Sequence, residues 1–283
     1  MKAIQQELYF YEKWYRDGGL ADYEKAFRFN NEKNIQAEIA MQLLEPGLDN
    51  YKQNMLKVLD IGCGTGKFTI LLLSKINSIR PEITFNVDLI DSSADALHQF
   101  QQRAQTLPAI CVNKKYEMTW RTFRQKALEK KETPKYDFID ADHSLYSEPI
   151  TKENFLPLLS LLNPGGMLLV ALESKQSIVR KMRESLGISI NCSEYLIDLL
   201  ESEGVKYKRL SYESKLYYSD DDPVFLKWFF MIPKEEKESS EWRRYRDTLE
   251  AHTTENGTSF CGCSKYILNI GDIILITREE TNG

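Results

Sequence analysis

The chain has 283 residues, enough for one large α/β domain with a complete core, and its 42% apolar content does not favour disorder. A formal net charge of −5 disfavours nucleic acid and membrane surfaces as partners, because both attract positive proteins. No stretch approaches the about 20 apolar residues that cross a bilayer. We therefore expect a cytoplasmic protein, and because nothing in the sequence calls for a partner chain, we expect a monomer.

The chain has five cysteines, an odd number scattered without the paired C-x-x-C spacing of zinc sites. We expect reduced thiols and no bound metal.

The first fifty residues predict a helical cap. Ile35, Ile39 and Leu43 recur at a spacing of four, between an Asn-Asn-Glu start signal and a Pro-Gly stop at 46–47. We assign 1–50 to an N-terminal helical cap on the substrate side of the protein.

From residue 57 onward, short apolar runs alternate with helical stretches, a pattern typical of a parallel sheet with crossover helices. Strands are predicted at 57–61, 84–90, 109–113, 136–141 and 166–172. Helices are predicted at 67–76, 93–105, 120–130, 152–162 and 192–203. Two further strands are predicted at 206–212 and 266–277.

These elements suggest a core over 51–216 and a final core strand within 263–283. The charged, aromatic-rich stretch between them, 217–262, predicts a helical insertion, because a bare loop of that length is uncommon in a compact domain.

A glycine-rich turn lies between the first predicted strand and its helix, in the run Leu59-Asp60-Ile61-Gly62-Cys63-Gly64-Thr65-Gly66. Glycines at alternate positions allow the backbone to bend closely around a ligand. The spacing is G-x-G-x-G, and not the G-x-G-x-x-G that cradles a pyrophosphate. Asp60 suits an α-ammonium group and repels a diphosphate.

A second carboxylate, Asp91, ends the next strand and is followed by Ser92. In α/β folds an acid at this place contacts ribose hydroxyls, so two acids and a glycine turn together fit a cationic nucleoside. The alternative is that the glycines form a plain turn and that Asp91 only caps the helix after it.

This run resembles motif I of class I S-adenosylmethionine-dependent methyltransferases, and the resemblance extends over 57–277. It implies a doubly wound Rossmann-like sheet of seven strands with the last strand antiparallel, S-adenosyl-L-methionine as cofactor, and methyltransferase activity. By this resemblance Asp60, Gly62, Gly64, Gly66 and Asp91 are expected to bind the cofactor.

Over a longer range the chain resembles the histamine N-methyltransferase family, which methylates small amines. The similarity is best at 128–132, 136–139, 145–146 and 193–207. It implies that Glu32 and Asn269 contact an amine substrate. It also implies cofactor contacts at Gly62, Asp91, Trp120 and Asp142, with Ser92 beside them.

Three positions depart from that family's pattern. Its glutamine after the second-strand acid is Ala96, its serine is Trp120, and the isoleucine-glutamine pair ending the fourth strand is Asp142-His143. These departures indicate a rebuilt substrate pocket. Trp120 either lies along the adenine or only anchors a helix.

His143 ends the fourth strand, at the ligand-binding edge of an open sheet, so it is a candidate to accept a proton or bind substrate. Its alternative is a hydrogen bond to a neighbouring loop. Tyr146 is a candidate to wall a pocket for a cationic amine, and its alternative is a place in the core. Glu32 has the alternative of complementing the helix dipole.

Other functions stay open. The run Ile139-Asp140-Ala141-Asp142-His143 is similar to the strand end that binds a divalent cation in metal-dependent O-methyltransferases, although the stretch after the next strand reads Ala-Leu-Glu-Ser and lacks their Asp-Asn. Methylation of protein or RNA and a non-catalytic cofactor binder are further alternatives. The preferred prediction is N-methylation of a small amine or imidazole-type compound.

Overall fold

A computed structural model describes residues 30–49, 51–128, 134–146, 148–185, 191–218, 240–260 and 263–279. Most of the predicted cap and half of the predicted insertion lie outside these residues. Among the helices of the described ranges, none is long and apolar enough to cross a membrane.

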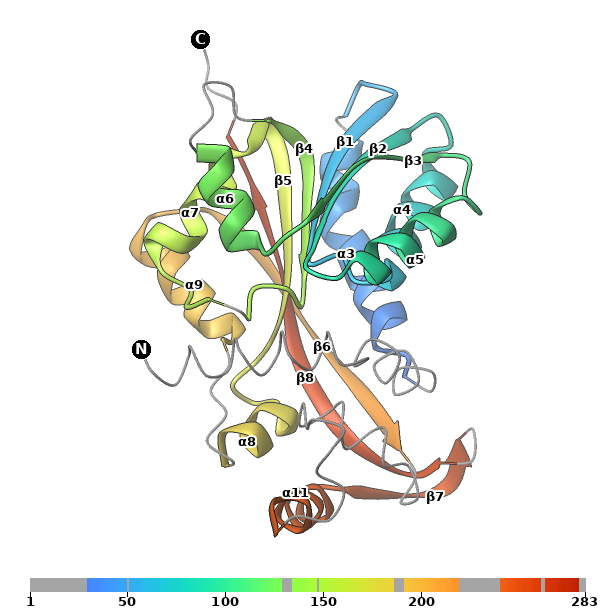
Figure 1. Ribbon diagram of the computed structural model, residues 1–283, viewed down its shortest axis with the longest axis vertical. Helices are drawn as coiled ribbons and strands as arrows, with labels where there is room; N and C mark the ends of the chain where they lie inside the picture. The colour runs from blue at the N-terminus through green and yellow to red at the C-terminus, as the bar shows by residue number, and fades with distance from the viewer. Residues whose placement is uncertain are drawn as a thin grey trace. The chain divides into compact units, whose positions relative to one another are not determined.

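The central element is one mixed sheet (Figure 1). Its strands are β1 (Met55–Ile61), β2 (Thr84–Asp91), β3 (Ile110–Glu117), β4 (Tyr136–Asp142), β5 (Leu162–Glu173), β6 (Tyr207–Tyr218), β7 (Thr254–Phe260) and β8 (Cys263–Thr277). The order is β3-β2-β1-β4-β5-β8-β6, with β7 paired to β8. Neighbours from β3 through β5 are parallel, which brings the carboxyl ends of β1, β2 and β4 to one edge.

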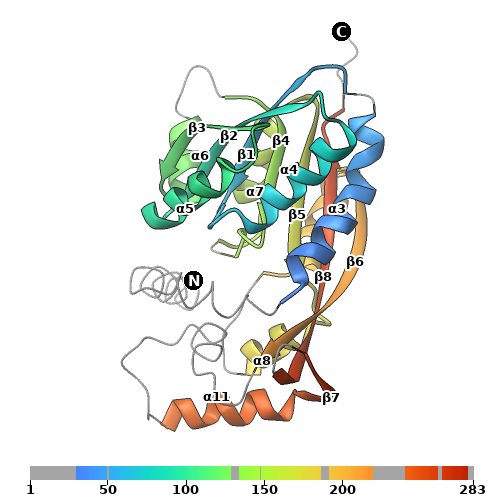
Figure 2. The same cartoon turned by 90° about the vertical axis from the view of Figure 1, so that its right-hand side faces the viewer.

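The helices alternate with these strands as the sequence predicts. They are α3 (Glu32–Leu48), α4 (Lys67–Ile79), α5 (Ala94–Ala104), α6 (Trp120–Leu128), α7 (Lys152–Ser160), α8 (Ile178–Ser185), α9 (Ser193–Ser202) and α11 (Ser240–Ala251). Helices α4 and α5 cover one face of the parallel strands (Figure 2), and α6, α7 and α9 cover the other (Figure 1). Because both faces are covered, the inner strands β1, β4 and β5 are mostly buried and carry apolar runs, whereas the edge strand β3 is mostly exposed.

The antiparallel last strand is confirmed. Arg278, just past β8, exchanges two backbone bonds with the start of β5: its N–H donates to the Gly166 carbonyl and its carbonyl accepts from Gly165 N–H, both at 2.9 Å. The end of the chain thus lies beside the beginning of β5. The expected class I methyltransferase fold is therefore present.

The structure adds one strand that the sequence does not predict. β7, reading Thr-Glu-Asn-Gly-Thr-Ser-Phe, pairs antiparallel with β8 through Thr254 opposite Tyr266. Its polar sequence has no alternating apolar pattern, so only the partner strand reveals it. Helix α8 is likewise absent from the prediction. Its residues are amphipathic, but eight residues make only about two turns, so the helical pattern has little room to repeat.

Two compact units make up the chain. The first includes residues 30–35, 173–185, 213–218, 240–260 and 263–271. The second includes 36–172, 191–212 and 272–279, and it holds the parallel strands and the glycine turn. Each unit is described by itself below.

In the second unit a fully buried carboxylate links the neighbouring strands β6 and β8. Asp272 of β8 accepts two bonds from the Arg209 guanidinium of β6, at 2.8 and 2.9 Å. It also accepts from the hydroxyls of Ser193 and Ser211. Four donors satisfy both oxygens, which makes burial of this charge tolerable.

Candidate active site

The glycine turn after β1 requires glycine for steric reasons. Gly62, Gly64 and Gly66 have φ angles of 65°, 49° and 78°, in the left-handed region that side chains disfavour. A β-carbon on Gly62 would lie 2.5 Å from Cβ of Ser144, and one on Gly66 would lie 2.5 Å from Cδ2 of Phe100. These glycines are therefore required by the packing around the turn and do not form a plain loose turn. Gly66 allows α4 to begin directly against Phe100, and Gly62 stays exposed to solvent.

Asp91, at the end of β2, accepts hydrogen bonds from the glycine turn and from the start of the next helix. One carboxylate oxygen accepts from Gly64 N–H and the other from Ser93 N–H, both at 2.9 Å. Burial raises the pKa of Asp91 above its ordinary value, and the backbone N–H groups of Ser93, Gly64 and Ser92 oppose that rise. Ser93 itself caps α5 by accepting from Ala96 N–H, so Asp91 is not the helix cap that the alternative proposed. Ser92 is exposed beside it.

Two more buried carboxylates, close to the turn, share one hydroxyl neighbour. The Thr69 hydroxyl of α4 lies 2.5 Å from Asp60 of β1 and 3.0 Å from Asp140 of β4. Burial, together with the charges of Asp60, Asp91 and Asp140, raises the pKa of the Cys63 thiol well above its usual value. The turn is thus surrounded by negative potential, and the thiol remains protonated.

This donor and acceptor set fits a positively charged nucleoside. Three carboxylates from neighbouring strand ends attract a sulfonium and an α-ammonium group, and each oxygen of Asp91 keeps a lone pair for a ribose hydroxyl beyond its backbone bond. The exposed Gly62 lets a ligand approach the backbone. The residues present therefore suit S-adenosylmethionine.

His143 follows β4 at the same edge. It has a φ of 48°, unusual for a residue with a side chain, while its N–H still donates to the Ala171 carbonyl at 3.0 Å. Its Nδ1 lies 2.6 Å from the Tyr146 hydroxyl. Its Nε2 lies 2.7 Å from the amide nitrogen of Gln36 and 3.0 Å from the Tyr212 hydroxyl. Asp142, just before it, is partly exposed.

Trp120 opens α6 and is 7% exposed. Its ring stacks on Phe123, with centroids 6.0 Å apart and planes at 30°, and it belongs to a core cluster that includes Leu145 and Phe155. This packing favours the anchoring interpretation. Contact between Trp120 and the adenine stays a prediction.

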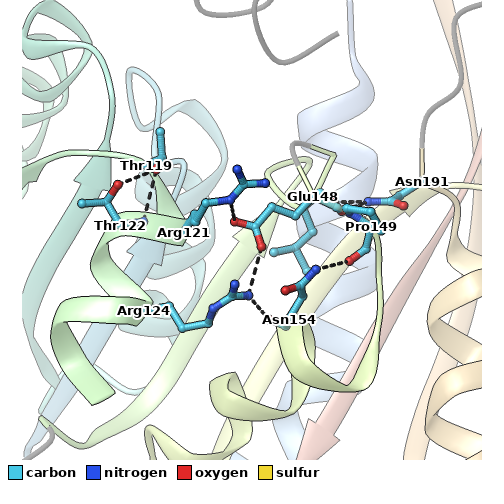
Figure 3. Close-up of polar contacts among 9 residues, drawn as sticks. Thr119, Arg121, Thr122, Arg124, Glu148, Pro149, Asn154 and Asn191 are labelled. Carbon is cyan, nitrogen blue, oxygen red and sulfur yellow. Dashed lines mark hydrogen bonds and ion pairs between the residues drawn. The ribbon is translucent and has the colours of Figure 1, made fainter. Parts of the chain in front are cut away.

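The loop after β4 is fixed by Glu148, a buried residue that the sequence analysis missed (Figure 3). Its carboxylate lies 2.7 Å from Nε of Arg121 and 3.0 Å from Nη1 of Arg124, both on α6. Asn191 donates to the carbonyls of Leu145 and Glu148. The loop that carries Tyr146 is therefore held at several points.

In the first unit, the two residues expected to contact the amine lie together. The Asn269 amide nitrogen donates to Oε1 of Glu32 at 2.5 Å, and both residues are 2% exposed. The Asn269 amide oxygen accepts from the Ser177 hydroxyl at 2.8 Å. Glu32 is also the first residue of α3, so its capping alternative and its pairing with Asn269 are both compatible with the structure.

The residues missed by the sequence analysis carry little local signal. Gln36 and Thr69 are polar side chains beside apolar residues, whereas Glu148 and Tyr212 lie among polar residues, and all four are buried. A buried polar side chain needs a partner, but the sequence does not say which.

Comparison with known proteins decides the family. A family model described as a methyltransferase domain matches residues 52–240, more than half of the chain. The chain belongs to this methyltransferase family. It is a class I enzyme that uses S-adenosylmethionine, as the geometry of the glycine turn indicates.

Curated relatives of this methyltransferase are distant. Histamine N-methyltransferase B of Xenopus laevis is 22% identical over 210 residues, covering 69% of this chain and 72% of the relative. Histamine N-methyltransferase of Danio rerio is 25% identical over 169 residues, covering 56% and 57%.

Two solved structures share the fold. The YcgJ protein of Bacillus subtilis superposes with a TM-score of 0.51 at 13% identity, covering 84% of this chain and 98% of that one. A Bacillus halodurans protein has a TM-score of 0.50 at 12% identity, covering 83% and 98%. At these identities the likeness concerns the fold alone.

Among the described residues, no group of three or more His, Cys, Asp or Glu side chains is arranged to hold a metal ion.

Proposed function

We propose that this methyltransferase acts on a small molecule and methylates the nitrogen of an amine or imidazole-type substrate. The curated relatives are histamine N-methyltransferases, at identities that leave the methyl acceptor open. The observation that carries the proposal is the contact between Glu32 and Asn269, which are 237 residues apart in the chain.

A buried carboxylate held by an amide is suited to an ammonium or imidazolium group. Asn269 uses its amide nitrogen on Glu32 and its amide oxygen on Ser177, so its orientation is fixed. Such a fixed carboxylate binds a cation more strongly than a solvated one, because little reorganisation is needed. We therefore assign Glu32 to the substrate amine and Asn269 to the orientation of Glu32.

When bound, S-adenosylmethionine supplies an electrophilic methyl group on a sulfonium. The protein must hold the accepting nitrogen in line with that methyl and keep it unprotonated. We assign the proton of the reacting nitrogen to His143, with Tyr146 as its hydrogen-bonded neighbour. The cofactor itself is assigned to Asp60, the three glycines of the turn, Asp91 and Ser92, and, by resemblance, to Trp120 and Asp142.

The test uses the purified full chain, methyl-labelled S-adenosylmethionine and a panel of amines, imidazoles, catechols, proteins and RNA. Glu32→Gln removes the charge and keeps the shape. It is expected to raise the KM of the amine about 10- to 100-fold, as for the loss of a charge-assisted hydrogen bond. The Kd for S-adenosylhomocysteine, measured by calorimetry, is expected to stay within twofold.

Glu38→Gln is the matched control, since Glu38 lies on the same helix with its side chain 65% exposed. It is expected to leave both constants unchanged. Equal losses of substrate and cofactor binding in Glu32→Gln would contradict the assignment. Activity that disappears with EDTA and returns with Mg²⁺ would instead favour a metal-dependent O-methyltransferase, and cofactor binding without turnover on any acceptor would favour a regulatory binder.

A further inference from the structure

Helix α8 begins beside the contact between Glu32 and Asn269, within the first unit. Ser177 is the residue immediately before α8, and its carbonyl accepts the first helical bond, from Lys181 N–H at 3.1 Å. The Ser177 hydroxyl oxygen accepts from Arg180 N–H at the long distance of 3.4 Å and lies 2.8 Å from the Asn269 amide oxygen. Ser177 therefore occupies the N-cap position of α8 and also contacts the residue that orients Glu32.

The segment before α8 is held on strand β8 by backbone bonds. Ser174 N–H donates to the carbonyl of Ile270, the residue after Asn269, at 3.0 Å. The Ser174 carbonyl accepts from Ser177 N–H, also at 3.0 Å. Ser177 is 0% exposed, so its hydroxyl has to find its partners within the protein. These bonds place that hydroxyl opposite the Asn269 side chain.

Partners at both ends fix the direction of the Asn269 amide. An ionised carboxylate only accepts hydrogen bonds, so the amide atom that faces Oε1 of Glu32 at 2.5 Å is the nitrogen. The amide oxygen then faces Ser177, whose hydroxyl can donate to it. Because the single hydroxyl hydrogen is used on Asn269, the hydroxyl oxygen is left to accept from Arg180 N–H. Three bonds thus run in one direction, from α8 through Ser177 and Asn269 to Glu32.

We propose that Ser177 is a positioning residue for the substrate amine, and that its hydroxyl acts through Asn269 to hold Glu32 charged and oriented. The inference rests on the proposed function, in which Glu32 binds that amine. Hydrogen bonds aligned in one direction polarise one another, so the Asn269 amide donates more strongly while its oxygen accepts from Ser177. A carboxylate has about four lone-pair sites, so the bond from Asn269 does not saturate Glu32.

The two roles of Ser177 can be separated, because glycine is accepted at an N-cap position but has no hydroxyl. Ser177→Gly is expected to raise the KM of the amine about 3- to 10-fold, as for the loss of one neutral hydrogen bond. The kcat and the Kd for S-adenosylhomocysteine are expected to stay within twofold, since only substrate binding is weakened. Ser177→Thr keeps a hydroxyl at the cap and is expected to keep the KM within twofold of the unaltered chain.

Ser177 is expected to act only through Asn269. In Asn269→Ala, which has already lost the amide, the addition of Ser177→Gly is expected to raise the KM of the amine no further. Ser185→Ala is the matched control and is expected to leave the KM unchanged, because Ser185 ends the same helix and its hydroxyl donates to the Met182 carbonyl at 2.7 Å. An unchanged KM in Ser177→Gly would overturn the proposal. So would the same further rise in the Asn269→Ala background.

A measurement without substrate separates this proposal from the proposed function. In ¹⁵N–¹H NMR spectra of asparagine-labelled full chain, Asn269→Asp identifies the amide signals of Asn269 by their loss. The hydrogen bonded to Glu32 is expected downfield of the other side-chain amide hydrogens and is expected to move upfield in Ser177→Gly, because the amide is then less polarised. Signals that keep their positions in Ser177→Gly would refute the role of the hydroxyl, even in a chain that methylates no amine. An unaltered KM in Glu32→Gln would instead refute the proposed function, whatever the spectra show.

Discussion

Replacement of Gly66 by alanine tests the steric reason for the glycine turn. Gly66 has a φ of 78°, and an added β-carbon would lie 2.5 and 2.8 Å from two carbons of the Phe100 ring and 2.9 Å from Cδ1 of Ile70. Gly204, after α9, has a φ of 65° with nothing within 4 Å of an added β-carbon. The two positions share the backbone penalty and differ in the space available.

The left-handed conformation costs an L-residue about 1–2 kcal/mol, and this cost applies to both variants. Overpacking of a filled core adds about 1–3 kcal/mol at Gly66 alone. We therefore expect the free energy of unfolding to fall by about 2–5 kcal/mol in Gly66→Ala and by about 1–2 kcal/mol in Gly204→Ala. Urea denaturation of the cofactor-free chain measures both. Equal losses in the two variants would refute the steric argument.

The remaining predictions concern charged side chains. Asp91→Asn is expected to weaken S-adenosylhomocysteine binding about 10- to 100-fold by calorimetry, and unchanged affinity would remove Asp91 from the site. Because burial raises the pKa of Asp91, binding by the unaltered chain is expected to weaken with falling pH at a higher pH than for an ordinary aspartate, and Asp91→Asn is expected to remove that dependence. Asp272→Ala leaves the Arg209 guanidinium without its bidentate partner and is expected to lower the urea unfolding free energy by about 3–5 kcal/mol; a loss under about 1 kcal/mol would contradict the structural role. Glu148→Gln is expected to cost about 1–3 kcal/mol in the same assay, since two arginines lose their carboxylate.

Much of the fold could be predicted because its signals are local. The turn at Gly62–Gly66 requires left-handed backbone conformations, so glycines at alternate positions mark it in the sequence. Ser93 marks the start of α5 by its capping side chain. The inner parallel strands β1, β4 and β5 are mostly buried and carry apolar runs, whereas the edge strand β3 is mostly exposed and polar. Strand β7 carries no such pattern, since it is defined by pairing with β8.

The candidate site likewise contains residues that the sequence predicts and residues that it does not. Asp60 and Asp91 follow from the spacing of the motif, whereas the partners of His143 do not. Gln36 is 107 residues from His143 along the chain, and Tyr212 is 69 residues away on the other side. Only the packing of α3 and β6 brings them to the end of β4. No local pattern encodes such a contact.

The protonated thiol of Cys63 has a practical consequence for covalent chemistry. Alkylating reagents and peroxides react with thiolates. The pKa of the Cys63 thiol is raised first by burial and then by three neighbouring carboxylates, so this sulfur reacts slowly. Cys111, on the edge strand β3, is exposed. A maleimide probe would therefore attach at Cys111 before Cys63, and a fluorophore could report on the enzyme while the cofactor-binding loop stays chemically intact.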